Sequence, residues 1–101
     1  MSHDSKMCAT VETIKYKPGK LPESIDLARK LQPDLQAIAG RRHMISIWND
    51  DEDVEYVISI WENPEAKAAA ASEVNALGAK FGDIFEDSKA EDFQNAWFIV
   101  G

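Results

Sequence analysis

The feature that most constrains the fold is a pair of apolar segments joined by a short acidic segment. The two apolar segments, Arg41–Trp48 and Val54–Trp61, are rich in β-branched and aromatic side chains, which favour β-strands. The five residues between them, 49–53, include four acidic side chains and are too charged to bury. This pattern predicts a β-hairpin whose turn lies in solvent.

A helix is predicted to start directly after the second of these strands. Asn63 can accept hydrogen bonds from free backbone N–H groups, and Pro64 fits the first helical turn. The helix is expected over residues 64–81 because apolar side chains recur there at helical spacing, at Ala66, Ala70, Val74, Leu77 and Phe81.

Three further elements complete the predicted order. Residues 8–16 are expected to form the first strand, and residues 21–39 a helix that Pro33 kinks or splits into two. Residues 83–92 are expected to be irregular or to form a short helical turn, and residues 93–100 to form the last strand. The order β-α-β-β-α-β predicts a ferredoxin-like α+β fold, in which helices cover one face of a four-stranded antiparallel sheet.

The predicted strands carry apolar or aromatic side chains on both of their faces. A monomer would therefore expose the face opposite the helices as a larger apolar patch than monomers usually tolerate. We expect a homodimer in which two sheets pack face to face around one barrel-like core.

Length and charge restrict the possible functions. A chain of 101 residues is expected to form one domain, assigned to residues 8–101, with residues 1–7 as a flexible N-terminal tail. The net charge is −7 and most basic residues are scattered, which argues against nucleic-acid binding. No apolar run reaches the roughly 20 residues that span a bilayer, so no membrane partner is expected. Because the start of the chain lacks a signal-peptide core, a cytoplasmic location is the default expectation.

No metal site is expected. Cys8 is the only cysteine, so an internal disulfide is impossible, and it is interpreted as a buried strand thiol. His43 has no other ligand at metal-binding spacing beside it. The acidic turn 50–53 lacks the glycine and the terminal glutamate of a calcium loop.

One segment carries a resemblance to a known family. Gly40 is expected to end the first helix; a strand and an acidic turn follow, and residues 58–66 read Ile-Ser-Ile-Trp-Glu-Asn-Pro-Glu-Ala. This resembles the antibiotic biosynthesis monooxygenase-like family of the dimeric α/β-barrel superfamily, where an apolar strand ends on tryptophan before alternating acidic and small or polar residues and an alanine. The element order matches over almost the whole chain, and the residue-level match covers the Gly40 region and residues 61–66.

The resemblance implies a dimer of ferredoxin-like units, each with a pocket between its sheet and its helices. Some family members oxidise quinol-like or polyketide aromatics with O₂ and without a cofactor, and relatives degrade haem through a histidine on the second helix. The predicted helix over residues 64–81 has no histidine, so haem degradation is not expected. The resemblance to the cofactor-independent members implies that no cofactor is needed. Some oxidising members place a polar group such as asparagine before the tryptophan, where this chain has Val57 and Ser59.

The resemblance implies that Trp61 would be the pocket tryptophan, which would position an aromatic ring. Ser59 shares a strand face with Trp61, and His43 could serve as a proton shuttle near neutral pH; in an oxygenase either would hydrogen-bond a phenolate. These three residues are the catalytic candidates. Trp61 also fits an ordinary core tryptophan, and His43 a strand or dimer-contact residue. The candidates for substrate binding are the neighbouring apolar position and the amphipathic aromatics: Val57, Trp97, Tyr16 and Trp48. Trp97 and Tyr16 fit the dimer seam as well as a pocket.

Three classes of function remain open on the sequence. The first is a cofactor-independent monooxygenase-like enzyme that acts on a small aromatic or quinol-type molecule. The alternative is a non-catalytic dimer, a small-ligand-binding or stress-associated protein, which the scarcity of acids and bases in the predicted pocket favours. A purely structural interaction domain is a third possibility.

Overall fold

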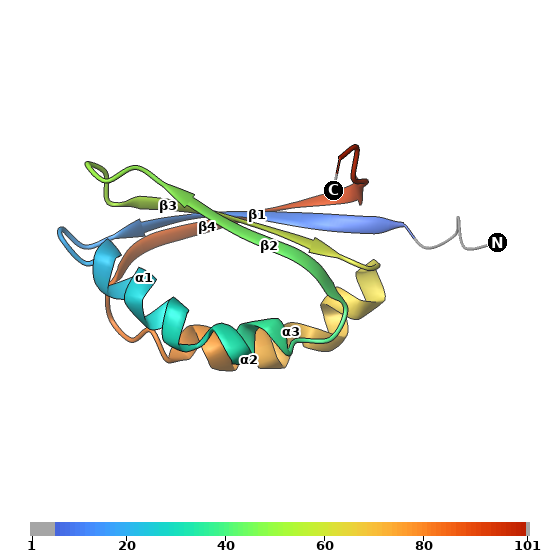
Figure 1. Cartoon of the computed structure of the whole chain (residues 1–101), viewed down its shortest axis with the longest axis horizontal. Coiled ribbons are helices and arrows are strands. Elements are labelled where there is room, and N and C mark those ends of the chain that lie inside the picture. The colour runs from blue at the N-terminus through green and yellow to red at the C-terminus, as the bar shows by residue number, and fades with distance from the viewer. Residues whose placement is uncertain (1–5, 101) are drawn as a thin grey trace.

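The computed structural model describes residues 6–100 and shows a four-stranded sheet with its helices on one side (Figure 1). The strands lie in the order β2-β3-β1-β4, and all three neighbouring pairs are antiparallel. The predicted ferredoxin-like arrangement is therefore confirmed. The elements are β1 (Met7–Tyr16), α1 (Leu21–Lys30), α2 (Gln32–Gln36), β2 (Arg41–Trp48), β3 (Val54–Trp61), α3 (Pro64–Ala79) and β4 (Phe85–Ala96).

The hairpin of β2 and β3 forms as predicted, and the side chains of β3 point alternately to the two faces of the sheet. Alternate residues of β3 are buried toward the helices: Glu55, Val57, Ser59 and Trp61. The residues between them point to the opposite face, as the period of two in a strand requires.

The strand β1, which begins one residue earlier than expected, pairs with β3 along its length. Only Lys6 and Met7 of the predicted tail over residues 1–7 are among the described residues.

Proline and asparagine set the helix boundaries in the way the sequence indicated. Pro33 lies in the first turn of α2, and the single residue Leu31 separates α2 from α1, so the predicted split is confirmed. The Asn63 side chain accepts a hydrogen bond of 2.7 Å from the backbone N–H of Ala66 and caps α3. The prediction that Gly40 ends a helix is wrong, because α2 ends at Gln36 and Gly40 lies in the turn before β2.

The predicted last strand is wrong in its position. Residues expected to be irregular belong to β4, which covers Phe85–Ala96 rather than 93–100. The strand is polar and exposed over most of its length, so it has no apolar alternation; its backbone pairing with β1 at the edge of the sheet forms it. Charged side chains on such an edge discourage pairing with other chains. Trp97 consequently lies beyond the strand and is 78% exposed.

The face of the sheet away from the helices, here called the outer sheet face, carries exposed apolar side chains. They come from three different strands and are between 40% and 47% exposed: Ile45, Ile47, Tyr56 and Phe93. Near one end of this face the Phe98 ring packs edge-on against His43, with ring centres 5.7 Å apart. Within the described residues, none of the helices is long and apolar enough to cross a membrane.

Candidate functional site

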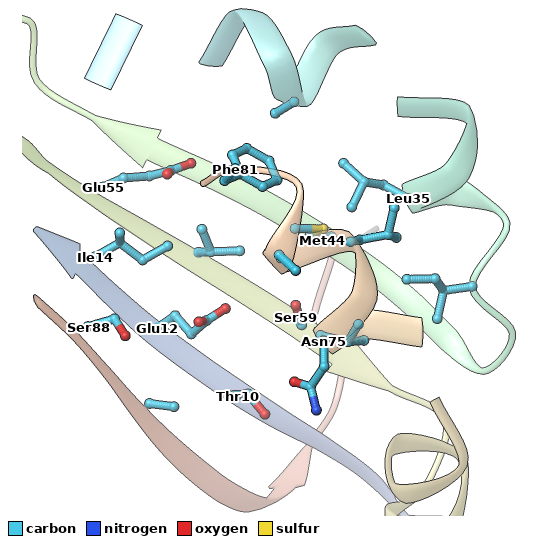
Figure 2. A pocket seen from close by; sticks show the side chains of 18 of the residues that line it. Thr10, Glu12, Ile14, Leu35, Met44, Glu55, Ser59, Asn75, Phe81 and Ser88 are labelled. Carbon is cyan, nitrogen blue, oxygen red and sulfur yellow. The ribbon is translucent and has the colours of Figure 1, made fainter. Parts of the chain in front are cut away.

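A cavity of about 650 Å³ lies between the inner face of the sheet and the helices; it is called the first cavity below. Its floor is built by β1 and β3, where Thr10 lies opposite Ser59 and Glu12 opposite Val57. Figure 2 shows the side chains of Thr10, Glu12 and Ser59 projecting from the strands toward the segment that carries Asn75 and Phe81. The same alternation that buries one face of β3 therefore aims a row of polar and apolar groups into one space.

Four of the sequence-predicted site residues meet in the first cavity. Val57, Ser59 and Trp61 come from successive inward positions of β3, and Tyr16 comes from the end of β1. The indole of Trp61 is buried, and it packs in a cluster with Cys8, Ile38 and Ala70. Trp61 is thus a core residue and a cavity wall at once, and the burial predicted for the Cys8 thiol is confirmed.

The other three predicted residues lie outside the first cavity. Trp48 and His43 contribute to a second cavity of about 610 Å³ beside β2. His43 is opposite Ile60 and shares the outer side of the sheet with it, so it does not reach a ligand that lies beside Ser59. Trp97 lines neither cavity.

Two carboxylates in the first cavity were missed by the sequence reasoning. Glu12 occupies an inward position of β1 between Thr10 and Ile14, and Glu55 is an inward position of β3 that is only 6% exposed. The period of two that selected Val57 and Ser59 also selects Glu55, so the signal was present in the sequence. An acidic residue on the inner face of a strand is costly unless it is paired or used, which makes both positions informative.

Hydrogen bonds hold the Glu55 carboxylate in place. The Tyr16 hydroxyl donates to Glu55 Oε1 at 2.6 Å and lies 2.8 Å from Ser24 Oγ, and the Ser46 hydroxyl donates to Glu55 Oε2. Burial and the hydrogen bond to Glu55 raise the pKa of Tyr16 well above its ordinary value. Glu55 is therefore a satisfied buried acceptor that fixes the rings and hydroxyls around it.

Glu12 has a different environment. None of the side-chain hydrogen bonds within residues 6–100 involves its carboxylate. Burial and the nearby Glu55 charge raise the pKa of Glu12 above its ordinary value, and the Arg41 charge opposes the increase. A carboxylate with a raised pKa is a better proton acceptor near neutral pH than a free glutamate, so Glu12 is suited to general-base chemistry.

Arg41 fixes the end of the first cavity next to Trp61. Its guanidinium donates a hydrogen bond of 2.7 Å to the backbone carbonyl of Leu35, and its Cζ lies 5.6 Å from the centre of the Trp61 ring. The half-buried cation over the indole adds to the attraction between them. These contacts connect the start of β2 with α2 and hold the tryptophan in one orientation.

Comparison with known proteins places this geometry on a known fold. No protein-family model and no curated protein sequence matches the chain. A solved structure of a MhuD variant with two manganese protoporphyrin IX bound per active site has a TM-score of 0.73 and 15% identity, and the match covers 93% of this chain and 99% of that one.

Two further solved structures carry the name antibiotic biosynthesis monooxygenase. The protein from Bordetella bronchiseptica has a TM-score of 0.74 and 11% identity, with 91% of this chain and 99% of that one covered. The protein from Chloroflexus aurantiacus has a TM-score of 0.65 and 16% identity, with 93% and 99% covered. At these identities the agreement is one of fold.

Proposed function

We propose that this chain binds a small aromatic molecule of quinol type in the first cavity and oxidises it with O₂. Its fold is that of the antibiotic biosynthesis monooxygenases, which confirms the predicted resemblance at the level of fold. The observation that carries the proposal is the Glu12 carboxylate. It is free of side-chain hydrogen bonds within the described residues, its pKa is raised by burial, and it faces a cavity with mainly apolar walls.

The cavity has the size and the lining that such a ligand needs. A volume of about 650 Å³ lies within the range of small-molecule sites. Trp61 and Val57 would contact the faces of the ring, and the Ser59 hydroxyl would hydrogen-bond an oxygen substituent, since all three line the cavity from one strand. Asn75 on α3 adds an amide on the opposite wall.

The proposed reaction uses Glu12 as the general base. Glu12 accepts the proton of a quinol hydroxyl, and the electron pair of the resulting phenolate, delocalised onto the neighbouring C–H carbon of the ring, forms a bond from that carbon to O₂. The resulting peroxide takes up a proton; its O–O bond then breaks as the same carbon loses its one hydrogen as a proton. The outer oxygen leaves as water and the other remains as a carbonyl. The C–H and the neighbouring O–H are thus converted with O₂ to two C=O groups and H₂O, with O₂ as the only oxidant. The protein orients the ring, moves the proton and excludes water.

Oxygen uptake with a panel of quinols tests the proposal. Purified protein is expected to consume O₂ with at least one quinol of this size, and product formation is expected to stop under anaerobic conditions. Trp61→Phe is expected to lower kcat/KM by roughly tenfold or more, because the ring is positioned less well. Trp97→Phe is the matched control, since Trp97 lies outside both cavities. Turnover that does not need O₂, or equal activity of the Trp61 and Trp97 variants, would contradict the proposal.

A non-catalytic ligand-binding protein is the second candidate function. The observation that favours it is the Glu55 network, in which Tyr16, Ser24 and Ser46 are bound to one another or to Glu55 and so are occupied. Tight binding of a quinol without O₂ uptake by the wild type would support this function over catalysis.

We also propose that the outer sheet face forms a homodimer interface. Exposed apolar side chains from β2, β3 and β4 gather on this face, and two copies would bury them together. The expected result is a dimer at micromolar concentration in analytical ultracentrifugation, and a shift to monomer in Ile47→Glu. Ser72→Glu, on an exposed position of α3, adds the same charge and should leave the dimer intact. A wild type that sediments as a stable monomer would contradict the proposed interface.

A further inference from the structure

The second cavity adjoins the first. It lies beside β2, where α1 and α2 run along that strand (Figure 1). Five residues line both cavities, so the two spaces share walls: Ala28, Leu35, Arg41, Met44 and Glu55. A ligand with its ring in the first cavity can therefore place a substituent toward the second.

The lining of the second cavity carries more positively charged side chains than the lining of the first. Arg29 comes from the last turn of α1, and Arg41 and Arg42 come from the start of β2. Glu55 is the single acidic residue in the lining, although the whole chain has a net charge of −7. The charge of this lining is therefore opposite in sign to the net charge of the chain.

The acidic residue in the lining does not neutralise these arginines. The Glu55 oxygens accept hydrogen bonds from Tyr16 and Ser46. Among residues 6–100 no carboxylate lies within ion-pair distance of Arg29, Arg41 or Arg42. Arg41 is held by its bond to the Leu35 carbonyl and by the Trp61 ring, which leaves a fixed cation on the wall between the two cavities.

We propose that the second cavity binds a carboxylate of the same ligand whose aromatic ring occupies the first cavity, so that the substrate class is an aromatic carboxylic acid with a quinol ring. This rests on the proposed function. Arginine suits the role because its planar guanidinium binds a carboxylate through two parallel hydrogen bonds and stays charged when half-buried. The apolar floor beside Trp61 and the cationic wall at Arg41 then recognise opposite ends of one molecule.

Isothermal titration calorimetry without oxygen tests the inference with two matched probes. 1,4-Dihydroxy-2-naphthoate carries the carboxylate, and 1,4-dihydroxynaphthalene has the same rings without it. The naphthoate is expected to bind about tenfold tighter or more, as a charge-assisted hydrogen bond provides. The difference is expected to shrink as salt is raised, because Arg29 and Arg42 are exposed.

The double variant Arg29→Gln, Arg42→Gln is expected to remove two of the three cations and so reduce this advantage, with Arg41 supplying the remainder, while binding of the neutral quinol is unchanged. Lys30→Gln is the control for charge, since Lys30 lies in the same last turn of α1 but does not line the cavity. Equal affinity of the wild type for both probes would overturn the inference and leave the proposed function intact. If neither probe binds, the quinol ligand itself is wrong, and the inference falls with the proposed function.

Discussion

Glu12→Gln is expected to abolish most of the oxygen-dependent turnover and, at the same time, to make the fold more stable at neutral pH. The amide keeps the size of the side chain but cannot accept the substrate proton, so kcat should fall by about 10² to 10⁴, the usual contribution of a general base. Binding of the neutral quinol should change little, because the ring contacts of Trp61 and Val57 remain. The measurement is steady-state O₂ uptake, with calorimetric affinity as the second readout.

The stability half of this prediction follows from the direction of the pKa shift. Burial and Glu55 raise the pKa of Glu12 in the folded state, so the folded protein binds that proton more tightly than the unfolded chain. The stabilisation from protonation is present in full below the ordinary pKa of 4.5 and is lost as the pH rises through the folded value. At neutral pH the ionised Glu12 therefore destabilises the fold, and the glutamine removes that cost.

Urea unfolding from pH 4 to pH 8 measures this effect. The variant is expected to exceed the wild type in unfolding free energy at the upper end of the range, with the difference closing toward acid pH. Glu73→Gln is the control, because it removes the same charge from an exposed position of α3. A Glu12→Gln protein that is less stable than the wild type at pH 8 would show that the carboxylate has a stabilising partner. Retained turnover would assign the base role elsewhere.

The sequence predicted the elements whose cause is local. The hairpin, the split at Pro33 and the cap at Asn63 all depend on side chains within the element or next to it. The last strand depends instead on backbone pairing of a polar segment with β1, which no periodicity in that segment reveals. Its misplacement also explains why Trp97 was expected in the site.

The site was partly predictable for the same reason. The period of two in a strand predicts that Val57, Ser59 and Trp61 point inward. The same period places Glu55 and Glu12 on the inward faces of their strands, although both are acidic. The catalytic role of His43 stays a prediction, and its position on the outer side of the sheet follows from a shift in the pairing of β2 with β3 between Arg41 and His43. Such an irregularity reverses the side of the sheet to which the following residues point. The amino-acid types at this position do not predict it.

Gly40→Ala is expected to destabilise the fold by about 2 to 5 kcal/mol, the sum of two separate effects. Gly40 has a φ of +82°, a conformation that costs a residue with a Cβ about 1 to 2 kcal/mol. The added Cβ would also lie 2.6 Å from Ala66 Cβ, and relieving such a contact in a packed region costs about 1 to 3 kcal/mol. Gly19→Ala isolates the first effect, because Gly19 has a φ of +77° and nothing within 4 Å of the added atom.

The turn at Gly40 is also joined to the segment between β3 and α3. The Gly40 carbonyl accepts a 2.8 Å hydrogen bond from the backbone N–H of Glu62, the residue that follows Trp61 at the end of β3. Adding Ala66→Gly to Gly40→Ala removes the clashing atom, and the nearest remaining Ala66 atom is 3.6 Å away. A double-mutant cycle by chemical unfolding should therefore show a favourable coupling of about 1 kcal/mol or more. Equal losses at Gly40 and Gly19, with no coupling to Ala66, would mean that backbone strain alone explains the glycine and that the close packing of α3 against this turn is not required.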